Sequence, residues 1–373
     1  MKSIGIILAG GNNNRIGRLS DKRAIAALPV AGSYRAIDFT LSNMSNSRVS
    51  KVAVLPQFNA RSLNEHLSSS KWWDFGRKQG GLYVFTPTVT KNNNSWYQGT
   101  ADALYQNIDF LKKSHEPYVI IATGDGVYKM DYGKVLEAHI AKNADITVVY
   151  TTLKDTDDDL TRFGVLKLDE NERITEFEEK PLVASSNNVS IGVYVIRRRH
   201  LIEILERCAR EDRHDFVQDV LVRYRNVRKI YGYKLDTYWR NIATVDSYYK
   251  TNMDFLKKDV RDYFFKQYPD VYSKVDDLPP AKYNAGAEVK NSIISSGCIV
   301  NGKVENSIIF KDVYIGNNCT IKNSIILNDV YIGDDSYIEN CIVESRDTLK
   351  ANTYYCGENG IKIVSEHNER YVL

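Results

Sequence analysis

The stretch that decides the fold is Val313-Tyr-Ile-Gly-Asn-Asn-Cys-Thr-Ile-Lys-Asn-Ser-Ile-Ile-Leu327, which returns 17 residues later as Val330-Tyr-Ile-Gly-Asp-Asp-Ser-Tyr-Ile-Glu-Asn-Cys-Ile-Val-Glu344. Aliphatic residues step by six through each copy, as in Ile315, Ile321 and Leu327, and the glycines Gly316 and Gly333 stand at the corners. Three hexads make one triangular coil of a parallel β-helix, with one inward aliphatic per hexad stacked on the coil below. A series of β-hairpins is the alternative, and several near-copies of one phrase argue against it.

The phrase Asn-Ser-Ile-Ile also begins at Asn291 and Asn306, so the repeats are 15 or 17 residues long rather than 18, and the corners must be trimmed. Upstream of the repeats, residues 255–284 are charged and aromatic and then contain Pro279-Pro280, which predicts a helix followed by an extended connector. We therefore predict three parts, residues 1–254, 255–284 and 285–373, of which the last is the β-helix.

Residues 1–254 alternate short apolar runs with segments of helical spacing. The predicted strands are residues 4–9, 52–55, 118–122, 146–150 and 192–196, and the predicted helices are 101–113, 134–142 and 201–207. The runs are almost continuously apolar, as strands buried on both faces should be. This alternation predicts an α/β architecture with a mostly parallel sheet.

Length, charge and cysteine usage narrow the function class. A chain of 373 residues exceeds one ordinary core, so two domains are expected. Its 50 basic and 47 acidic residues are spread along the chain, which argues against a nucleic-acid partner. Five cysteines without a C-x-x-C pair indicate free thiols in a reducing cytosol. The first apolar run is too short for a signal peptide, and no run reaches the ~18 residues of a membrane span, so we expect a cytoplasmic protein with no membrane partner.

Three motifs in the α/β part could carry chemistry. Gly10-Gly11 follows the first strand, where backbone N–H groups can close on a phosphate, although a plain strand-to-helix turn fits equally well. Asp125 follows the strand at 118–122, at the edge where open α/β sheets bind ligands, and its carboxylate suits Mg²⁺ or simply caps a turn. In Glu179-Lys180-Pro181 the lysine could bind a phosphate and the glutamate sugar hydroxyls, or the run could be a solvated charged face.

Together these phrases resemble the ADP-glucose pyrophosphorylase (glucose-1-phosphate adenylyltransferase) family over nearly the whole chain. The matching strings are Ile6-Ile-Leu-Ala-Gly-Gly, Tyr34-Arg35-Ala-Ile37-Asp38-Phe39, Leu41-Ser42-Asn43, Asn46-Ser47, Trp96-Tyr97-Gln-Gly99-Thr100-Ala101-Asp102-Ala103, Gly124-Asp125, Glu179-Lys180-Pro181, His214-Asp215-Phe216 and Tyr238-Trp239-Arg240. The resemblance implies a Rossmann-like nucleotidyltransferase domain followed by a left-handed β-helix. It also implies the conversion of ATP and glucose 1-phosphate into ADP-glucose and pyrophosphate for glycogen synthesis, with Mg²⁺ as the cofactor of an active chain.

The family's functional residues map onto this chain position by position. The resemblance implies Arg15, Asp125 and Lys180 as catalytic residues, with Asp125 as the Mg²⁺ ligand. It implies that Gly10, Gly11, Gln57 and Gly99 bind the nucleotide, and that Tyr97, Glu179, Lys180 and Asp215, or its neighbour Asp219, bind the sugar phosphate. Arg23 and Arg35 lie in segments that shape the family's effector pocket.

Three sites that carry the family's chemistry depart from its pattern, and two further positions also differ. Asn13 and Asn14 replace a glycine and a threonine of the nucleotide loop, Ile25 replaces a lysine, and Asn241 replaces the second metal-binding aspartate. Gln98 replaces an arginine, and Gly126 replaces the histidine after Asp125. The pattern is similar to the D-type, non-catalytic glycogen biosynthesis subunit. It predicts a regulatory or weakly active subunit that forms a heterotetramer with a catalytic paralogue. The alternatives are an active adenylyltransferase with a compensated site and another sugar-phosphate nucleotidyltransferase.

Overall fold

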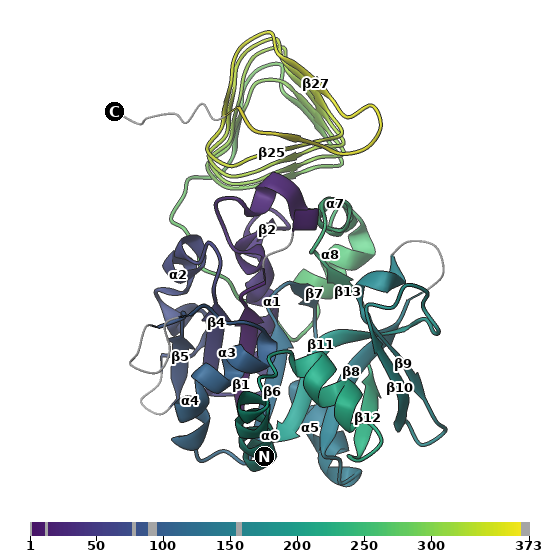
Figure 1. Ribbon diagram of the computed structural model, residues 1–373. Coiled ribbons are helices and arrows are strands. Elements are labelled where there is room, and N and C mark those ends of the chain that lie inside the picture. Colours follow the sequence, from purple (N-terminus) through teal and green to yellow (C-terminus); the bar gives the residue numbers. More distant parts are fainter. Residues whose placement is uncertain (1, 12–13, 77–79, 89–94, 154–158, 367–373) are drawn as a thin grey trace. The chain divides into compact units, whose positions relative to one another are not determined.

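The computed structural model describes residues 2–11, 14–76, 80–88, 95–153 and 159–366 (Figure 1). The chain forms two compact units that interleave along the sequence. Unit 1 consists of Met1–Asn12 and Phe39–Trp239, and unit 2 consists of Asn13–Asp38 and Arg240–Leu373. The segment between the first strand and the first long helix therefore belongs with the C-terminal part of the chain, and the two units are described separately below.

Unit 1 is built on a nine-stranded sheet in which β10, β9, β11, β6, β1, β4 and β5 follow one another and β8 joins β11 to β12. Its strands are β1 (Ser3–Ala9), β4 (Lys51–Pro56), β5 (Gly81–Val84), β6 (Tyr118–Thr123), β8 (Ile146–Thr152), β9 (Gly164–Leu168), β10 (Ile174–Glu179), β11 (Asn188–Arg197) and β12 (Ile230–Lys234). β1 pairs in parallel with both β4 and β6, whereas β11 runs antiparallel to β6 and β8. The predicted α/β architecture is confirmed, and all five predicted strands are present.

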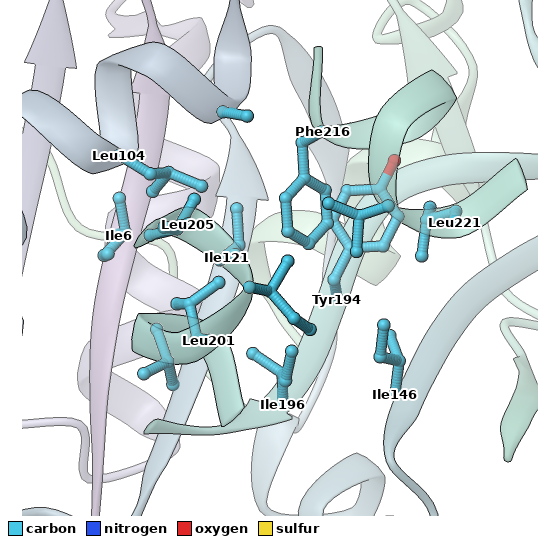
Figure 2. Packing of buried hydrophobic residues seen from close by; sticks show 14 of the residues in the cluster. Ile6, Leu104, Ile121, Ile146, Tyr194, Ile196, Leu201, Leu205, Phe216 and Leu221 are labelled. Atoms are coloured by element: carbon cyan, nitrogen blue, oxygen red, sulfur yellow. The ribbon is translucent and has the colours of Figure 1, made fainter. Parts of the chain in front are cut away.

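Helices pack on this sheet and bury its apolar side chains. They are α1 (Ala36–Asn46, which begins in unit 2), α2 (Arg61–Leu67), α3 (Thr100–Gln106), α4 (Ile108–Lys112), α5 (Tyr132–Ala141) and α6 (Arg198–Arg210), with short 3-10 or π turns at Ser70–Trp73, Leu160–Arg162 and Val217–Val222. Figure 2 shows how side chains of α3, α6 and the 217–222 turn pack on the inner strands. Ile6, Ile121 and Leu205 in this cluster are at most 3% exposed.

The helix predicted over residues 101–113 is broken in two at Asn107. Asn107 has φ −105° and ψ 21°, outside the helical region. Its side-chain amide donates to the carbonyl of Ala103 at 2.9 Å and to the hydroxyl of Tyr97 at 3.0 Å. The prediction of one continuous helix was wrong because a contact with Tyr97, which no helical spacing reveals, fixes the break.

Unit 2 contains a parallel β-helix with three faces (Figure 1). Each face is a five-stranded sheet, in the orders β14-β17-β20-β23-β26, β15-β18-β21-β24-β27 and β16-β19-β22-β25-β28. These strands are Lys282–Tyr283, Glu288–Lys290, Ile293–Ile294, Ile299–Val300, Lys303–Glu305, Ile308–Ile309, Tyr314–Ile315, Thr320–Lys322, Ile325–Ile326, Tyr331–Ile332, Tyr337–Glu339, Cys341–Val343, Thr348–Leu349, Tyr354–Cys356 and Lys362–Val364, numbered β14 to β28 in order. The predicted β-helix is confirmed and agrees with the left-handed type.

Each of these coils is shortened by one residue before the stack that contains Ile326. Ile326, not Leu327, pairs with Ile309 below and Val343 above, so the inward residues Ile315, Ile321, Ile326 and Ile332 are six, five and six residues apart. The predicted step of six to Leu327 was therefore wrong by one residue. Both positions are apolar and fully buried, so the sequence pattern alone did not distinguish them.

Residues with a left-handed backbone conformation form corners of the coils. One corner repeats as Asn291, Asn306, Asn323 and Asn340, all with φ between 43° and 52°, because asparagine tolerates this conformation better than most residues. Gly316 serves a different need. A Cβ there would lie 2.7 Å from the backbone nitrogen of Asp334 in the next coil, so glycine allows the coils to stack.

The rest of unit 2 consists of short elements. The 3-10 turns are Asn14–Ser20 and Ile25–Ala27, the strands are β2 (Pro29–Val30) and β3 (Tyr34–Arg35), and the helices are α7 (Val245–Asp254) and α8 (Lys258–Phe265). All five cysteines are free thiols. Among the residues that the structure describes, no helix combines the length and apolar character needed to cross a membrane.

A buried histidine gives unit 1 an expected sensitivity to acid. His139 of α5 is 1% exposed, and its Nδ1 lies 2.9 Å from the hydroxyl of Thr147. Burial, reinforced by the positive charges of Arg197 and His200 and opposed by Asp145, lowers the pKa of His139 from 6.5 to about 4. The folded state therefore holds this imidazole neutral where the unfolded chain would protonate it.

We expect unit 1 to lose stability as the pH falls from 6.5 toward 4, because over this range the unfolded state binds more protons than the folded state. The depressed pKa of His139 accounts for about 3 kcal/mol of this loss. In His139→Gln the melting temperature should fall less between pH 7 and pH 4.5 than in the wild type, as followed by circular dichroism. His115→Gln, at an exposed histidine, is the control. Parallel curves for all three proteins would contradict the assignment.

Candidate functional site

The two glycines after β1 meet different surroundings. A Cβ on Gly10 would lie 3.2 Å from the Cβ of Gln57 and 3.4 Å from the carbonyl of Leu55, so a side chain would disturb this packing. A Cβ on Gly11 would meet no atom of the described residues within 4 Å. Gly11 is exposed, so its backbone is accessible to a phosphate, although the space around it would also admit a side chain. The altered position Asn13 lies outside the described residues.

Gln57 and Tyr97 form a clamp between β4 and the start of α3. The Gln57 Oε1 accepts from the backbone nitrogen of Tyr97 at 2.7 Å, and its Nε2 donates to the Tyr97 carbonyl at 3.2 Å. The Tyr97 hydroxyl donates to the carbonyl of Phe85 at 3.0 Å, and burial raises its pKa. Both side chains, predicted to contact ligand, thus have structural partners that fix the loop entering α3.

The loop entering α3 is tied to the residues around Asp215. A Cβ on Gly99 would lie 2.4 Å from the carbonyl oxygen of His214, so only glycine fits. That carbonyl accepts from the backbone nitrogen of Ala101 at 2.7 Å, and the Thr100 hydroxyl accepts from the nitrogen of Phe216 at 2.8 Å. Two motifs more than a hundred residues apart in the sequence are therefore brought together in unit 1.

Glu179, Lys180 and Asp215 form a charged group at the end of β10. The Lys180 Nζ lies 3.1 Å from the Glu179 Oε1, and the lysine side chain is 63% exposed whereas the glutamate is 17% exposed. Burial raises the pKa of Glu179; Lys180 opposes this shift, and Asp215 adds to it. Asp219 instead binds Arg213 at 3.1 Å. The charge of Asp215 thus acts on Glu179, and Asp219 accepts a hydrogen bond from the backbone nitrogen of Asp215 at 2.9 Å.

Lys180 has an unusual backbone conformation. Its φ is +50°, and its nitrogen donates to the carbonyl of Phe163 at 3.0 Å, which extends the pairing of β10 with β9 past the last residue of β10. A left-handed conformation in a residue other than glycine costs about 1–3 kcal/mol and often marks a functional site. The Lys180 ammonium group is exposed beside Glu179, so it is accessible to an anion.

Asp125 stands between β6 and β7 (Gly126–Tyr128), at the carboxyl end of a central parallel strand. The preceding residue Gly124 donates to the carbonyl of Leu8 at 3.0 Å, which anchors the turn to β1. Burial raises the pKa of Tyr128 to about 12, and the charge of Asp125 adds to this shift. The Asp125 carboxylate therefore acts within reach of the Tyr128 phenol.

Trp239 is a neighbour of this turn that the sequence prediction omitted. Its indole is 8% exposed, and its Nε1 has no hydrogen-bond partner among the described residues. The Cβ that a larger residue would carry at Gly126 would lie 3.6 Å from this nitrogen, and the ring of Phe163 packs edge-on at 5.5 Å. Its motif, Tyr238-Trp239-Arg240, was recognised, but no pattern indicated the unpaired donor.

The remaining predicted residues lie in unit 2. Arg15 is exposed in the 14–20 turn. Ile25 is 7% exposed and lies among the buried Ala24, Ala26 and Ala27. The Asn241 Oδ1 accepts from the nitrogen of Ala243 at 2.9 Å.

The two arginines predicted to shape an effector pocket also lie in unit 2. The guanidinium of Arg23 is bound to Glu344 at 2.6 Å. The backbone nitrogen of Arg35 donates to the Oδ2 of Asp38 at 2.8 Å. Arg23 thus has an internal carboxylate partner in this fold.

The donor set of unit 1 fits a magnesium ion held together with a substrate. Mg²⁺ keeps several of its waters and binds through one or two carboxylates and substrate phosphates. Asp125 supplies one such carboxylate at the sheet edge. Among the described residues no group of three or more His, Cys, Asp or Glu side chains could hold a metal.

Comparison with known proteins adds two kinds of match. Residues 4–258 match the family model described as nucleotidyl transferase, and residues 279–361 match the model described as GlmU-like, C-terminal hexapeptide. The glucose-1-phosphate adenylyltransferase of Clostridium acetobutylicum is 39% identical over 321 residues, which cover 85% of this chain and 84% of that protein. The protein of the same name from Pseudothermotoga lettingae is 38% identical over 323 residues, covering 86% of this chain and 76% of that protein.

Proposed function

The chain belongs to the glucose-1-phosphate adenylyltransferase family, and from this premise we propose that it is a regulatory or weakly active member, which assembles with a catalytic relative. The reaction of the assembly is the conversion of ATP and glucose 1-phosphate to ADP-glucose and pyrophosphate, as a step of glycogen synthesis. In this proposal the chain binds substrates or products but contributes little turnover of its own.

The proposal gives the residues of unit 1 a binding role. The exposed ammonium of Lys180 receives the phosphate of glucose 1-phosphate, and Glu179 accepts from the sugar hydroxyls beside Asp215. The backbone of Gly11 faces the triphosphate. Phosphoryl transfer requires little covalent chemistry from the protein, so these residues act by positioning two anions. Mg²⁺, held by Asp125, would neutralise charge on the phosphates.

The observation that carries the impaired role is the environment of Ile25. The family usually has a lysine at this position, and here the side chain is 7% exposed within an apolar 3-10 segment of unit 2. A lysine would have to bury its charge there, which is costly without a partner. The position has thus become part of the core, which supports the loss of a cation from the family's phosphate-binding set. Asn241, a neutral amide in place of a carboxylate, supports the same reading.

A second candidate function is an active adenylyltransferase whose lost groups are compensated. The charged residues Glu179, Lys180 and Asp215 favour this alternative. A chain that does not catalyse the reaction would not have to keep them. Another sugar-phosphate nucleotidyltransferase stays a further alternative, which a screen of other nucleotides would test.

The proposed assembly is tested by mixing the purified chain with a catalytic adenylyltransferase from the same cell. We expect the two to co-elute from a size-exclusion column, native mass spectrometry to give a heterotetramer, and the mixture to differ from the catalytic protein at least twofold in apparent substrate affinity or rate. The Clostridium acetobutylicum enzyme is a non-cognate control. Separate elution together with unchanged kinetics would contradict the regulatory role.

A further inference from the structure

Polar side chains on one face of α1 bind the backbone on both sides of Asp125. The hydroxyl of Thr40 donates to the carbonyl of Thr123, the last residue of β6, at 3.0 Å. Three residues further along α1, the Asn43 Nδ2 donates to the carbonyl of Tyr128 at 3.1 Å, and its Oδ1 accepts from the nitrogen of Met130 at 3.1 Å. All these residues belong to unit 1.

These contacts are buried. Thr40 is 0% exposed and Asn43 is 2% exposed. A helix face that packs on a sheet is normally apolar, so buried polar groups here need a reason. The reason is that β6 ends at Thr123, where its backbone leaves the regular ladder and its carbonyl needs a donor from elsewhere. Residues 40 and 43 meet this need because side chains three apart share one face of a helix.

The two bonds fix the turn that carries Asp125 at both ends. Thr123 precedes Asp125 by two residues, and Tyr128 follows it by three. The buried phenol of Tyr128 lies beside these residues: its hydroxyl is 2.7 Å from that of Tyr132, and Thr40 and Asn43 oppose the rise that burial causes in its pKa. The carboxylate thus stands on a short segment with fixed ends rather than on a free loop.

We propose that Thr40 and Asn43 are positioning residues for Asp125, which hold its carboxylate in the orientation that a divalent cation and a nucleotide phosphate require. This inference rests on the proposed function of Asp125. Neither residue contacts substrate in the proposal, and both act through the backbone of residues 123–128. Displacement of a binding group by about 1 Å can remove much of its contribution to binding. A single isosteric substitution on α1 should therefore lower the affinity for the ligand.

The test compares Thr40→Val, Thr40→Ser and Thr151→Val in the full chain. Thr151 is a matched control, because its hydroxyl is buried and donates to the carbonyl of Leu235 at the same distance of 3.0 Å. Binding of Mn²⁺, used as a probe in place of Mg²⁺, is measured by electron paramagnetic resonance in the presence of ATP. Amide hydrogen exchange over residues 123–128 is measured without ligand.

We expect Thr40→Val to weaken Mn²⁺ binding about three- to tenfold and to speed amide exchange over residues 123–128 by a similar factor, the range for one hydrogen bond of ordinary net strength. Thr40→Ser, which keeps the hydroxyl, should restore both properties. Thr151→Val should leave both within twofold of the wild type even if its melting temperature falls as far.

Unchanged binding and exchange in Thr40→Val, or equal effects in Thr151→Val, would overturn the inference. Failure of the wild type to bind Mn²⁺ with ATP would instead count against the proposed function. In that case the exchange measurement, which needs no ligand, still decides whether Thr40 holds the turn.

Discussion

Purified alone, the chain is expected to synthesise ADP-glucose at least about 10⁴-fold more slowly than a catalytic glucose-1-phosphate adenylyltransferase assayed with the same Mg²⁺, ATP and glucose 1-phosphate. Removal of one preorganised charge-stabilising group typically costs ~10²- to 10³-fold in rate. Here Ile25 and Asn241 replace two such groups of the family pattern, and the two losses need not add. Chromatographic detection of ADP-glucose measures the rate, and a turnover within tenfold of the catalytic protein would contradict the prediction.

The variant Asn241→Asp, assayed in the same way, tests directly whether the missing carboxylate limits the rate. It restores the carboxylate that the family resemblance places at this position, so we expect a rate increase of about 10²-fold, comparable to the typical effect of one such group. Asn171→Asp adds the same charge at an exposed position and should leave the rate unchanged. An increase in neither variant would show that Asn241 does not limit the rate, and would shift the explanation to Ile25 or to the nucleotide loop.

The β-helix could be predicted in detail because its physical cause is local and repeated. Each coil presents the same aliphatic positions and the same left-handed asparagine corner, so the sequence carries its period directly. What the sequence did not resolve was which of two adjacent apolar residues, Ile326 or Leu327, joins the stack. That choice depends on the coils above and below, where Ile309 and Val343 fix the register.

The sequence motifs could name candidate site residues but not the contacts that these residues make. The motifs identified Gln57, Tyr97 and the group around Lys180, yet no spacing predicted that the amide of Gln57 would pair with the backbone of Tyr97. The break at Asn107 has the same origin, because its partner is the Tyr97 hydroxyl. Such pairings join segments that the fold alone brings together, and a side chain's chemistry does not specify which backbone group it will meet.

A long-range contact of this kind within unit 2 is the ion pair between Arg23 and Glu344, which are 321 residues apart in the sequence. The Arg23 Nη2 lies 2.6 Å from the Glu344 Oε1, and its Nη1 donates to the hydroxyl of Ser345 at 3.1 Å. The two side chains are 11% and 6% exposed. Burial raises the pKa of Glu344, and Arg23 opposes that shift. The pair joins the 14–38 segment to a coil of the β-helix.

Arg23→Met is expected to destabilise unit 2 by about 3–5 kcal/mol at neutral pH, because it leaves a buried carboxylate without its partner. A carboxyl whose pKa is raised in the folded state stabilises the fold when protonated, and this contribution is lost as the pH rises through that pKa. The difference in melting temperature between Arg23→Met and the wild type should therefore shrink from pH 7.5 to pH 5. The double variant with Glu344→Gln should recover part of the loss at pH 7.5, since the orphaned charge is gone. Equal melting temperatures for Arg23→Met and the wild type at both pH values would show that the pair contributes nothing to holding the segment on the β-helix.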